Sequence, residues 1–580
     1  MRRLMQDGER PAGAGLLIEG VVIYPGLAGL PRGAAEPGAA GASAGEPIPD
    51  GAVWISGGLI RAVGPLEAVA AAAGADTPRL DGQGAVALPG LWDSHIHLGS
   101  WALARRRVDL GGCRSLDEVI ETLSPHAEAL PAGEWLEGQG LALNALAEGP
   151  GVDGRFLDAL AHRPVLLWSH DMHTVLMNRA AMVAAGVGTG FESWPPGSVV
   201  GRDPRTGELT GVFREKAIEL VMQSVPQPSL RDLAGRIESA QVELFRRGLV
   251  GVHSPEGPDV LGALGVLREQ GRLRVKVRLL PPASMLDTLR SAGIRQGFGD
   301  EYLKLGPVKA FADGSLGSLT AALLSPYSGL PDPAYAGELL MDGPAVEDLA
   351  LRAAEAGFAV AVHAIGDRAC RAVLDGVQAA RRRGMAPLPF PSRIEHVQLV
   401  AREDVQRLAA LGVVASMQPI HAPGDRPAAE RYWKGRTACA YAFRWILEAG
   451  AVLAFGSDAP VESVDPLEGI YAAVVRSSPG GRDGTASPWH PEQALAMLEA
   501  VRAYTLGAAL AVGEGGQRGL LKPGLAGDVV LLKPDILSAD RGAGGHTAAL
   551  GEGYREQAAA LLSQARVLAT VVDGHVVYTA

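Results

Sequence analysis

Six residues with metal-binding or proton-transfer chemistry stand at or just beyond the ends of short apolar runs in this 580-residue chain. They are His95, His97, Lys309, His363, His396 and Asp458. Histidine nitrogens and carboxylate oxygens are ligands that zinc, manganese and iron accept. If the apolar runs are strands whose carboxyl ends meet, these side chains share one place. The pattern therefore predicts a metal centre.

Taken singly, each of these residues has a plain structural explanation. A histidine after an apolar run is more often a core residue than a ligand, Asp458 fits a helix N-cap, and a lone lysine is most often ion-paired. His95 and His97 are two residues apart, so on an extended segment both imidazoles point to the same side. The recurrence of six such residues at matching ends favours the shared site.

The middle of the chain alternates apolar runs with Ala-, Leu- and Arg-rich helical stretches, which is typical of a parallel sheet. Eight runs predict a closed (β/α)₈ barrel, a TIM barrel of the α/β class, with its active site at the carboxyl ends of the strands. The runs are 84 to 90, 249 to 254, 274 to 280, 303 to 311, 358 to 364, 393 to 399, 413 to 419 and 451 to 457. A ninth run, 163 to 170, is assigned to an insertion, and the alternative is that it belongs to the barrel.

Short β-branched strands near both ends of the chain predict a second, composite β-sandwich domain, with Asp573 and Gly574 as a hairpin turn. We expect its two parts at 1–85 and 511–580, on either side of a barrel at 86–510. The barrel would carry an inserted subdomain at about 100–240, which is too long for a single crossover.

The composition narrows the class of protein. Lys and Arg total 53 against 64 Asp and Glu, a net charge of −11, which argues against nucleic-acid or anionic-membrane binding. Three cysteines are too few for a disulfide framework, and the charged N-terminus precedes no apolar segment of membrane-spanning length. We expect a cytoplasmic protein that acts on a small molecule, and a homodimer is compatible with the sequence.

Five segments together resemble the ordered motifs of the metal-dependent amidohydrolase superfamily, in particular amidohydrolase family 3 and its N-substituted formamide deformylase-like branch. The segments are PGLWDSHIHL (89 to 98), VKAFADGSLGSLTAALLSPYSG (308 to 329), VHAIGDRA (362 to 369), RIEHVQL (393 to 399) and GSDAPVESVDPLEGI (456 to 470). The resemblance extends from about residue 15 to the C-terminus.

The resemblance implies a ligand set. His95, His97 and Asp458 would hold one divalent metal ion, and His363 and His396 a second, with Lys309 bridging them as a carbamate formed from carbon dioxide. Zinc is the favoured metal. The alternative for Lys309 is an unmodified, ion-paired lysine beside a single ion. His173, followed by Asn178, resembles a family segment and would bind a polar group of the substrate, unless it is a helix-packing histidine.

The predicted activity is hydrolysis of a non-peptide amide or formamide-type bond, with Asp458 as general base and then general acid. The alternatives are a deaminase, an ester or lactone hydrolase on the same barrel, and a non-catalytic regulatory protein that keeps the fold. Two departures from the family pattern, Trp92 and the segment 253 to 257, put the substrate pocket in doubt.

Overall fold

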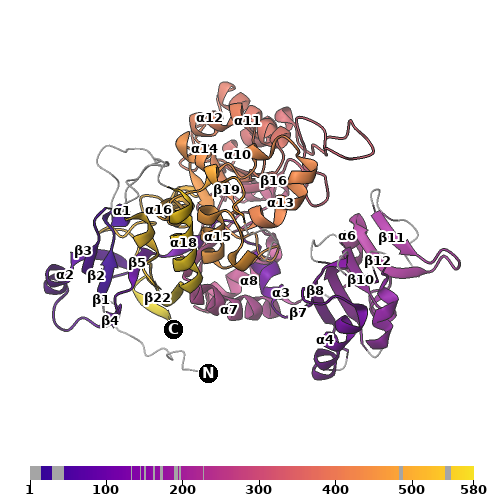
Figure 1. Ribbon diagram of the computed structural model, residues 1–580, viewed down its shortest axis with the longest axis horizontal. Coiled ribbons are helices and arrows are strands. Elements are labelled where there is room, and N and C mark those ends of the chain that lie inside the picture. The colour runs from indigo at the N-terminus through magenta and orange to yellow at the C-terminus, as the bar shows by residue number, and fades with distance from the viewer. Residues whose placement is uncertain are drawn as a thin grey trace. The chain divides into compact units, whose positions relative to one another are not determined.

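The computed structural model describes residues 15–28, 45–131, 133–143, 146–148, 152–160, 163–169, 174–187, 194, 198–225, 228–481, 487–541 and 550–580. The chain forms two compact units (Figure 1). One comprises Met1–Leu98 together with Glu238–Ala580, and the other comprises Gly99–Ile237.

Strands from both ends of the chain share one eight-stranded sheet in the first unit. The sheet contains β1 (Leu16–Ile23), β2 (Ile48–Ser56), β3 (Leu59–Pro65), β4 (Arg79–Asp81), β5 (Val86–Pro89), β21 (Val529–Lys533), β22 (Arg566–Val572) and β23 (His575–Thr579). The indigo N-terminal strands lie beside the yellow β22 in Figure 1. Asp573 and Gly574 join β22 to β23 with φ of 50° and 79°, so the predicted hairpin turn is confirmed.

Two parallel sheets carry the residues with predicted chemistry. One consists of β6 (Leu91–Asp93), β13 (Leu249–Ser254), β14 (Lys276–Leu279) and β15 (Leu303–Leu305). The other consists of β16 (Val308–Phe311), β17 (Val360–Ala364), β18 (Arg393–His396), β19 (Val414–Met417) and β20 (Leu453–Phe455). Most of their residues are buried, as expected for parallel strands covered on both faces.

Hydrogen bonds link these two sheets at two places. The Ser94 N–H, just after β6, donates to the Phe455 carbonyl of β20 at 2.9 Å, and the Lys309 N–H of β16 donates to the Pro281 carbonyl at 2.8 Å. The predicted run 303 to 311 is divided into β15 and β16 because Pro307 has no N–H to donate.

The first predicted barrel strand needs a correction. The run 84 to 90 forms β5, which pairs antiparallel with β21 in the eight-stranded sheet and not with the parallel strands. The parallel strand is the three-residue β6, which begins after Gly90. A Cβ on Gly90 would lie 2.5 Å from a Val250 methyl group, so the chain can pass between the two sheets only with glycine there.

Amphipathic helices follow the parallel strands. In α11, Ala369, Val373, Val377 and Ala380 are buried at helical spacing, and the last turn carries two arginines, which favour the negative end of the helix dipole. The helices of this unit are α1 (Pro25–Ala28), α2 (Leu66–Ala73), α8 (Pro258–Glu269), α9 (Leu286–Ser291), α10 (Gly343–Glu355), α11 (Asp367–Arg382), α12 (Arg402–Ala410), α13 (His421–Tyr432), α14 (Phe443–Glu448), α15 (Pro466–Val475), α16 (Met497–Ala503), α17 (Leu506–Leu510) and α18 (Glu552–Gln564).

The second unit has a six-stranded sheet of its own, in the order β11-β12-β10-β9-β8-β7. Its strands are β7 (Val108–Asp109), β8 (Leu136–Leu141), β9 (Val165–Ser169), β10 (Thr174–Met177), β11 (Ser198–Arg202) and β12 (Leu209–Glu215). The ninth apolar run therefore belongs to this sheet as β9. The helices are α4 (Leu116–Ala129), α5 (Arg179–Ala184) and α6 (Lys216–Ser224), and α3 (Leu98–Ala104) and α7 (Leu230–Arg246) lie where the two units join in the sequence.

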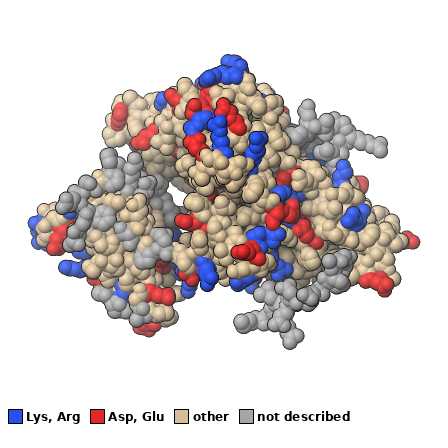
Figure 2. Space-filling model, turned by 180° about the vertical axis from the view of Figure 1, so that it is seen from behind, with Lys and Arg blue, Asp and Glu red and all other residues tan. Residues whose placement is uncertain are grey.

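The surface drawn in Figure 2 carries charges of both signs. Lys and Arg side chains lie among Asp and Glu side chains, so neither sign dominates this face. Among the helices of the described residues, none combines the length and apolar character that crossing a bilayer requires.

Candidate metal centre

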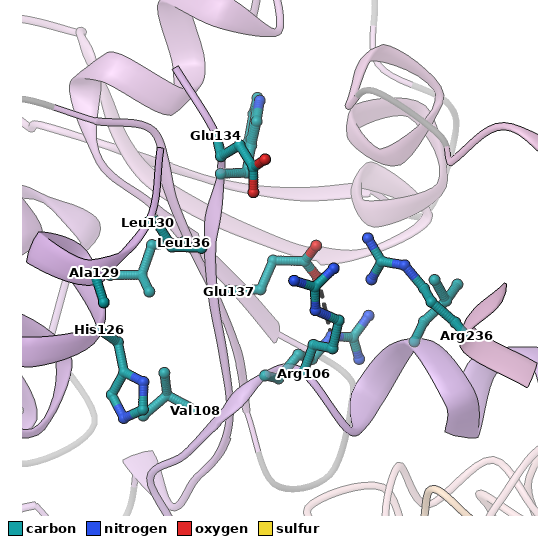
Figure 3. Close-up of a pocket in the computed structure, with 12 residues that line it drawn as sticks. Arg106, Val108, His126, Ala129, Leu130, Glu134, Leu136, Glu137 and Arg236 are labelled. Atoms are coloured by element: carbon teal, nitrogen blue, oxygen red, sulfur yellow. Dashed lines mark hydrogen bonds and ion pairs between the residues drawn. The ribbon is translucent and has the colours of Figure 1, made fainter. Parts of the chain in front are cut away.

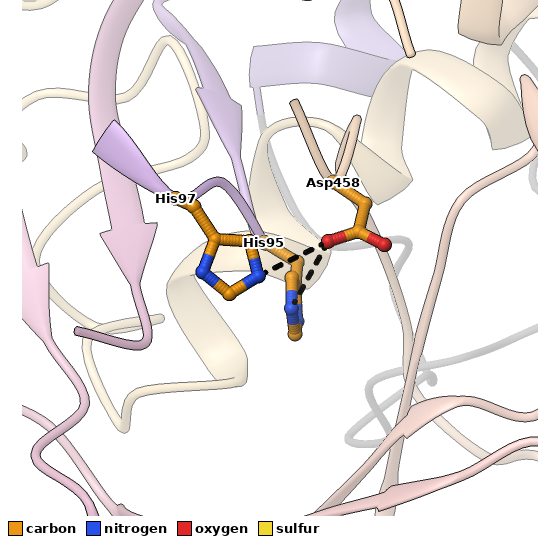
Figure 4. A group of neighbouring side chains, drawn as sticks. All are labelled: His95, His97 and Asp458. Carbon is orange, nitrogen blue, oxygen red and sulfur yellow. Dashed lines mark ion pairs between the residues drawn. The ribbon is translucent and has the colours of Figure 1, made fainter. Parts of the chain in front are cut away.

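His95, His97 and Asp458 form one group of candidate ligands (Figure 4). One ligand atom from each lies within 4.8 Å of the other two. Asp458 Oδ1 is 3.3 Å from His97 Nε2 and 3.6 Å from His95 Nε2. The two histidines lie in the turn after β6 and not on the extended segment that the sequence predicted. Their rings nevertheless face the same carboxylate oxygen.

Asp458 is held by a turn that follows β20. Its φ is 59°, a left-handed conformation that aspartate tolerates better than most residues, and its N–H donates to the His95 carbonyl at 2.7 Å. The preceding Ser457 donates to Asp93 from its N–H and its hydroxyl, at 3.0 and 2.5 Å. This bonding ties the end of β20 to the turn after β6, so the carboxylate and the two imidazoles come together.

His363 and His396 lie beside this group. The His396 ring centroid is 4.9 Å from that of His95 and 4.4 Å from that of His363. His363 is the fourth residue of β17 and His396 the last of β18, and these neighbouring strands pair in parallel register. Four of the thirteen histidines therefore lie close together, although they come from segments far apart in the chain.

Hydrogen bonds to one ring nitrogen set the tautomer of three of these histidines. His95 Nδ1 donates to Glu395 Oε2 at 2.6 Å, and His396 Nδ1 donates to Gln418 Oε1 at 2.8 Å. His363 has the opposite tautomer, because its Nε2 carries the proton and donates to the Gly314 carbonyl at 2.9 Å. In each ring the other nitrogen then carries a lone pair. Metal-binding histidines are held in this way by an acceptor on the far nitrogen.

His95 provides the test of whether a metal fits. Its Nε2 is buried and has no hydrogen-bond partner, although it lies close to Asp458. A buried nitrogen with a lone pair and no partner is costly unless something occupies the space in front of it. A divalent cation matches this nitrogen, the Asp458 oxygen and His97 Nε2, so the residues fit a metal ion.

Burial keeps three of the imidazoles neutral. Burial and the nearby charge of Lys309 lower the pKa of His95 to about 4 and that of His363 to about 3. Burial and His363 hold the pKa of His396 well below its ordinary value. His97 differs: burial lowers its pKa, but the hydrogen bond and charge of Asp458 together with the charge of Glu256 outweigh burial, and its pKa is raised. Metal binding at His97 therefore competes with a proton.

Asp458 is an anion at neutral pH. Burial alone would raise the pKa of its carboxyl, but the imidazoles of His97, His95 and His396 hold it well below the usual range. A carboxylate that is buried, ionised and directed at imidazole nitrogens is suited to bind a cation and to accept a proton.

Lys309 is buried on β16 next to these histidines. Burial lowers the pKa of its ammonium group to about 8. A fraction of the amine is therefore neutral near physiological pH, which is the form that reacts as a nucleophile. Its Nζ lies 4.9 Å from the ring centroid of Phe311, two residues along the same strand. Lys309 is thus placed with the predicted ligands.

A buried ion pair, missed in the sequence, lies against His95. Arg393 donates to both carboxylate oxygens of Glu395, at 2.6 and 2.9 Å, and to His253 Nδ1 at 2.9 Å. Arg393 and His95 hold the pKa of Glu395 well below its ordinary value, although burial opposes this. The only local signal is that Arg393 and Glu395 flank Ile394 in a run predicted to be a strand, and it does not indicate their partners.

Two further groups lie beside the candidate ligands, and of these His421 was missed in the sequence. His421 begins α13, and its Nε2 lies 3.3 Å from the Ser457 carbonyl and 4.0 Å from Asp458 Oδ2. Asp313 accepts N–H bonds from Ile365, Gly366 and Ala322, at 2.8 to 3.0 Å, and so shapes the loop after β16. Burial raises the pKa of Asp313 to about 7 despite these bonds.

The remaining predicted residues are less informative about the site. His173 lies outside the described residues. Asn178 caps α5, where its Oδ1 accepts the Ala181 N–H at 2.8 Å, so its observed contacts are structural. Trp92 is buried against His253, 5.7 Å between ring centroids, and two guanidinium groups lie over its ring. This departure from the family pattern is therefore a residue that packs in the core.

The insertion has a hollow of about 170 Å³ (Figure 3). Arg106, Glu137 and Arg236 lie at one side of it, and His126 and Val108 at the other. The Arg107 Nε donates to Glu137 at 3.0 Å. No residue of the candidate metal centre lines this hollow.

Comparisons with known proteins extend the sequence resemblance. The model of the amidohydrolase family matches residues 80–578. The putative amidohydrolase YtcJ of Bacillus subtilis is 31% identical over 499 residues, covering 84% of this chain and 92% of that protein. The N-substituted formamide deformylase of Arthrobacter pascens is 29% identical over 545 residues, covering 90% of this chain and 94% of the enzyme.

A solved structure supports the same assignment. An uncharacterized metal-dependent hydrolase from Pyrococcus furiosus superposes with a TM-score of 0.71 and 27% identity, over 90% of this chain and all of that one. The predicted family membership is therefore confirmed along most of the sequence. The chain belongs to the amidohydrolase family and is a hydrolase of carbon–nitrogen bonds.

Proposed function

We propose that the chain hydrolyses a non-peptide amide or formamide-type bond of a small molecule at the centre formed by His95, His97 and Asp458. One observation carries the proposal: His95 Nε2 is buried without a partner, 3.6 Å from an ionised carboxylate. The likeness to a formamide deformylase supports the choice of bond.

We also propose that the two parallel sheets form one closed (β/α)₈ barrel. Its expected bounds of 86–510 shift at the start to residue 91, because β5 belongs to the eight-stranded sheet. The two linking hydrogen bonds, at Ser94 and at Lys309, support closure. In this arrangement residues 100–240 are an insertion. The segment that ends with β5 at residue 89, in place of the expected 1–85, builds a composite β domain together with 511–580. The homodimer and the cytoplasmic location remain predictions from the sequence.

The candidate ligands divide into two groups, one for each metal ion. His95, His97 and Asp458 would hold one ion, and His363 Nδ1 and His396 Nε2, the nitrogens left free by their tautomers, would hold a second. A bound divalent ion polarises a carbonyl and brings water within reach of ionisation near neutral pH. Zinc suits this set of nitrogen and oxygen donors, and manganese and iron accept it too.

Proton transfer is assigned to Asp458. Its carboxylate accepts a proton from the attacking water and then gives it to the departing nitrogen, so one group acts first as base and then as acid. Its low pKa keeps it ionised before the reaction. His97 and His421 lie within 4.0 Å of its two oxygens and orient it. His173 is proposed to bind a polar group of the substrate.

Lys309 is proposed to bridge the two ions as a carbamate. Its buried position and lowered pKa favour the neutral amine. This amine would form an N–C bond to carbon dioxide and release one proton, and the product would be a carbamate anion. This modification converts the one cationic side chain among the ligands into an anion. Asp458 and the carbamate would then supply two anionic ligand groups for the metal ions.

The test is Asp458→Asn, with Asp465→Asn as the matched control. Asp465 caps α15, a role that asparagine fills equally well. Both variants and the wild type are assayed on N-formyl amines, N-acyl amino acids, cyclic ureides and esters, with and without chelator, and metal is measured by mass spectrometry.

We expect D458N to lose activity on the best amide by at least about 100-fold while it keeps most of its metal, because general acid–base groups contribute on that scale. D465N should behave as wild type. Normal turnover by D458N would exclude the proton-transfer role, and a fully active protein without metal would exclude the centre itself.

A further inference from the structure

The hollow in the inserted unit gathers positive charge in a protein whose net charge is −11. Three arginines, Arg106, Arg107 and Arg236, line its volume of about 170 Å³ together with two carboxylates, Glu134 and Glu137. In Figure 3, Arg106 and Arg236 lie beside Glu137, whereas Glu134 lies apart from them. A hollow of this size holds several water molecules or one small ligand.

Arg107 is the fixed member of the three. Its side chain is only 11% exposed, its Nε donates to Glu137 Oε2 at 3.0 Å, and its guanidinium carbon lies 5.2 Å from the centroid of the Trp168 ring. Glu137 therefore balances the charge of Arg107. No described residue accepts a hydrogen bond from the two terminal nitrogens of Arg107, so these donors are available to a molecule in the hollow.

Arg106 and Arg236 carry the charge that Glu137 does not balance. Neither forms an ion pair within the described part of the chain. Arg236 is attracted by Asp232, one turn earlier on α7, but that carboxylate accepts the Ser229 hydroxyl at 2.6 Å. Two guanidinium groups on one hollow repel each other, and an anion between them would offset this repulsion.

The arginines come from the two segments by which the chain enters and leaves the insertion. Arg106 and Arg107 follow α3, which begins at Leu98, and Arg236 lies on α7, which ends at Arg246. The insertion itself comprises Gly99–Ile237. The hollow is therefore built from both connections of the insertion, which lie far apart in the sequence.

We infer that this hollow binds a small dianion, a phosphate group or a dicarboxylate, through Arg106, Arg107 and Arg236. Guanidinium groups hold such oxyanions by paired, charge-assisted hydrogen bonds. A double negative charge matches the two guanidinium groups that Glu137 leaves unbalanced. The bound dianion joins the two connections of the insertion. The inference is independent of the proposed reaction, because no residue of the candidate metal centre lines the hollow.

The alternative is a patch of solvated arginines that attracts counterions and holds no ligand. Calorimetry on the metal-loaded protein separates the two, with inorganic phosphate, succinate and acetate as probes at about 0.15 M ionic strength. The variants are Arg106→Gln, Arg236→Gln and the double variant. Arg231→Gln is the matched control, because Arg231 is also exposed on α7 but does not line the hollow.

We expect one equivalent of phosphate or succinate to bind at least about tenfold more tightly than acetate, because a charge-assisted hydrogen bond contributes on that scale. R106Q and R236Q should each weaken this binding by about tenfold, and R231Q by less than about twofold. The tighter of the two dianions shows whether the ligand is phosphorylated or a dicarboxylate. Metal content and Tm confirm that each variant is folded and loaded.

Three results would overturn the inference. The first is that neither dianion binds more tightly than acetate. The second is binding that the double variant retains, which would assign the dianion to another place such as the metal centre. The third is an equal loss in R231Q, which would be a general effect of charge. If a dianion binds as expected but no amide is hydrolysed, the proposed function fails while the anion site stands.

Discussion

Replacing Glu395 by glutamine removes one negative charge from behind His95 and keeps the size of the side chain. Glu395 accepts three hydrogen bonds: one from His95 Nδ1 at 2.6 Å and two from Arg393 at 2.6 and 2.9 Å. Both members of the ion pair are fully buried. The substitution therefore disturbs the tautomer of a metal ligand and leaves a buried guanidinium without its anion.

The substitution should change two measurable quantities, the stability of the fold and the affinity for metal. Removing one partner of a buried ion pair costs about 3 to 5 kcal/mol. Arg393 keeps its bonds to the Ser94 carbonyl and the Ser416 hydroxyl, so we expect the lower end, about 3 kcal/mol, for the metal-free protein. Glutamine offers one neutral amide oxygen in place of two carboxylate oxygens, so the acceptor that orients His95 is weakened, and we expect metal affinity to fall by roughly 10- to 100-fold.

The matched control is Glu499→Gln. Glu499 forms the same kind of buried pair with Arg444, at 3.0 and 2.6 Å, and also accepts the Ala496 N–H. Urea unfolding of the metal-free proteins should show a similar loss of stability in both variants. Zinc affinity, measured by competition with a chromophoric chelator, should fall only in E395Q. If E395Q binds zinc within twofold of the wild type, Glu395 does not position His95 and the reasoning fails.

Two further predictions concern charge. Lys309→Ala should lower the metal content from two ions per chain to one, because the bridging carboxylate is lost; two ions per chain in this variant, by mass spectrometry, would contradict the carbamate. Arg278, Arg518 and Lys304 outweigh burial and lower the pKa of Glu514 from 4.5 to about 2. A lowered carboxyl pKa stabilises the folded state above pH 4.5, and this contribution, about 3 kcal/mol, is lost as the pH falls from 4.5 to 2. In urea unfolding of the metal-free protein, Glu514→Gln should therefore show a smaller loss of stability over that pH range than the wild type, and equal losses would contradict the assignment.

Several parts of the site were predictable because they depend on local pattern. Lys309, His363 and His396 lie in apolar runs, and an apolar run bounded by turn residues forms a buried strand in many contexts. The helical spacing of α11 and the turn at Asp573 and Gly574 were predictable for the same reason, because each depends on residues that are close together in the sequence. The assignment of 84 to 90 to the barrel was wrong, because that run forms only β5, and the strand of the parallel sheet, β6, begins directly after it at Leu91.

The supporting residues were not predictable, because their roles arise from contacts across the fold. His253 and Arg393 are 140 residues apart, and His95 and Glu395 are 300 apart, yet each pair is hydrogen-bonded. Nothing near His253 in the sequence indicates that its Nδ1 accepts a bond from an arginine. Likewise, the tautomers of His363 and His396 depend on Gly314 and Gln418, which only the folded chain brings to them.

The amino-acid sequence by itself indicated the family and which residues are candidate ligands, because ligand type and strand pattern are properties of single residues and their near neighbours. The tertiary structure decided which nitrogen of each histidine is free, which carboxylate is ionised and which apolar ring faces the centre. Those properties depend on burial and on partners hundreds of residues away, since desolvation and hydrogen bonding act through space and not along the chain.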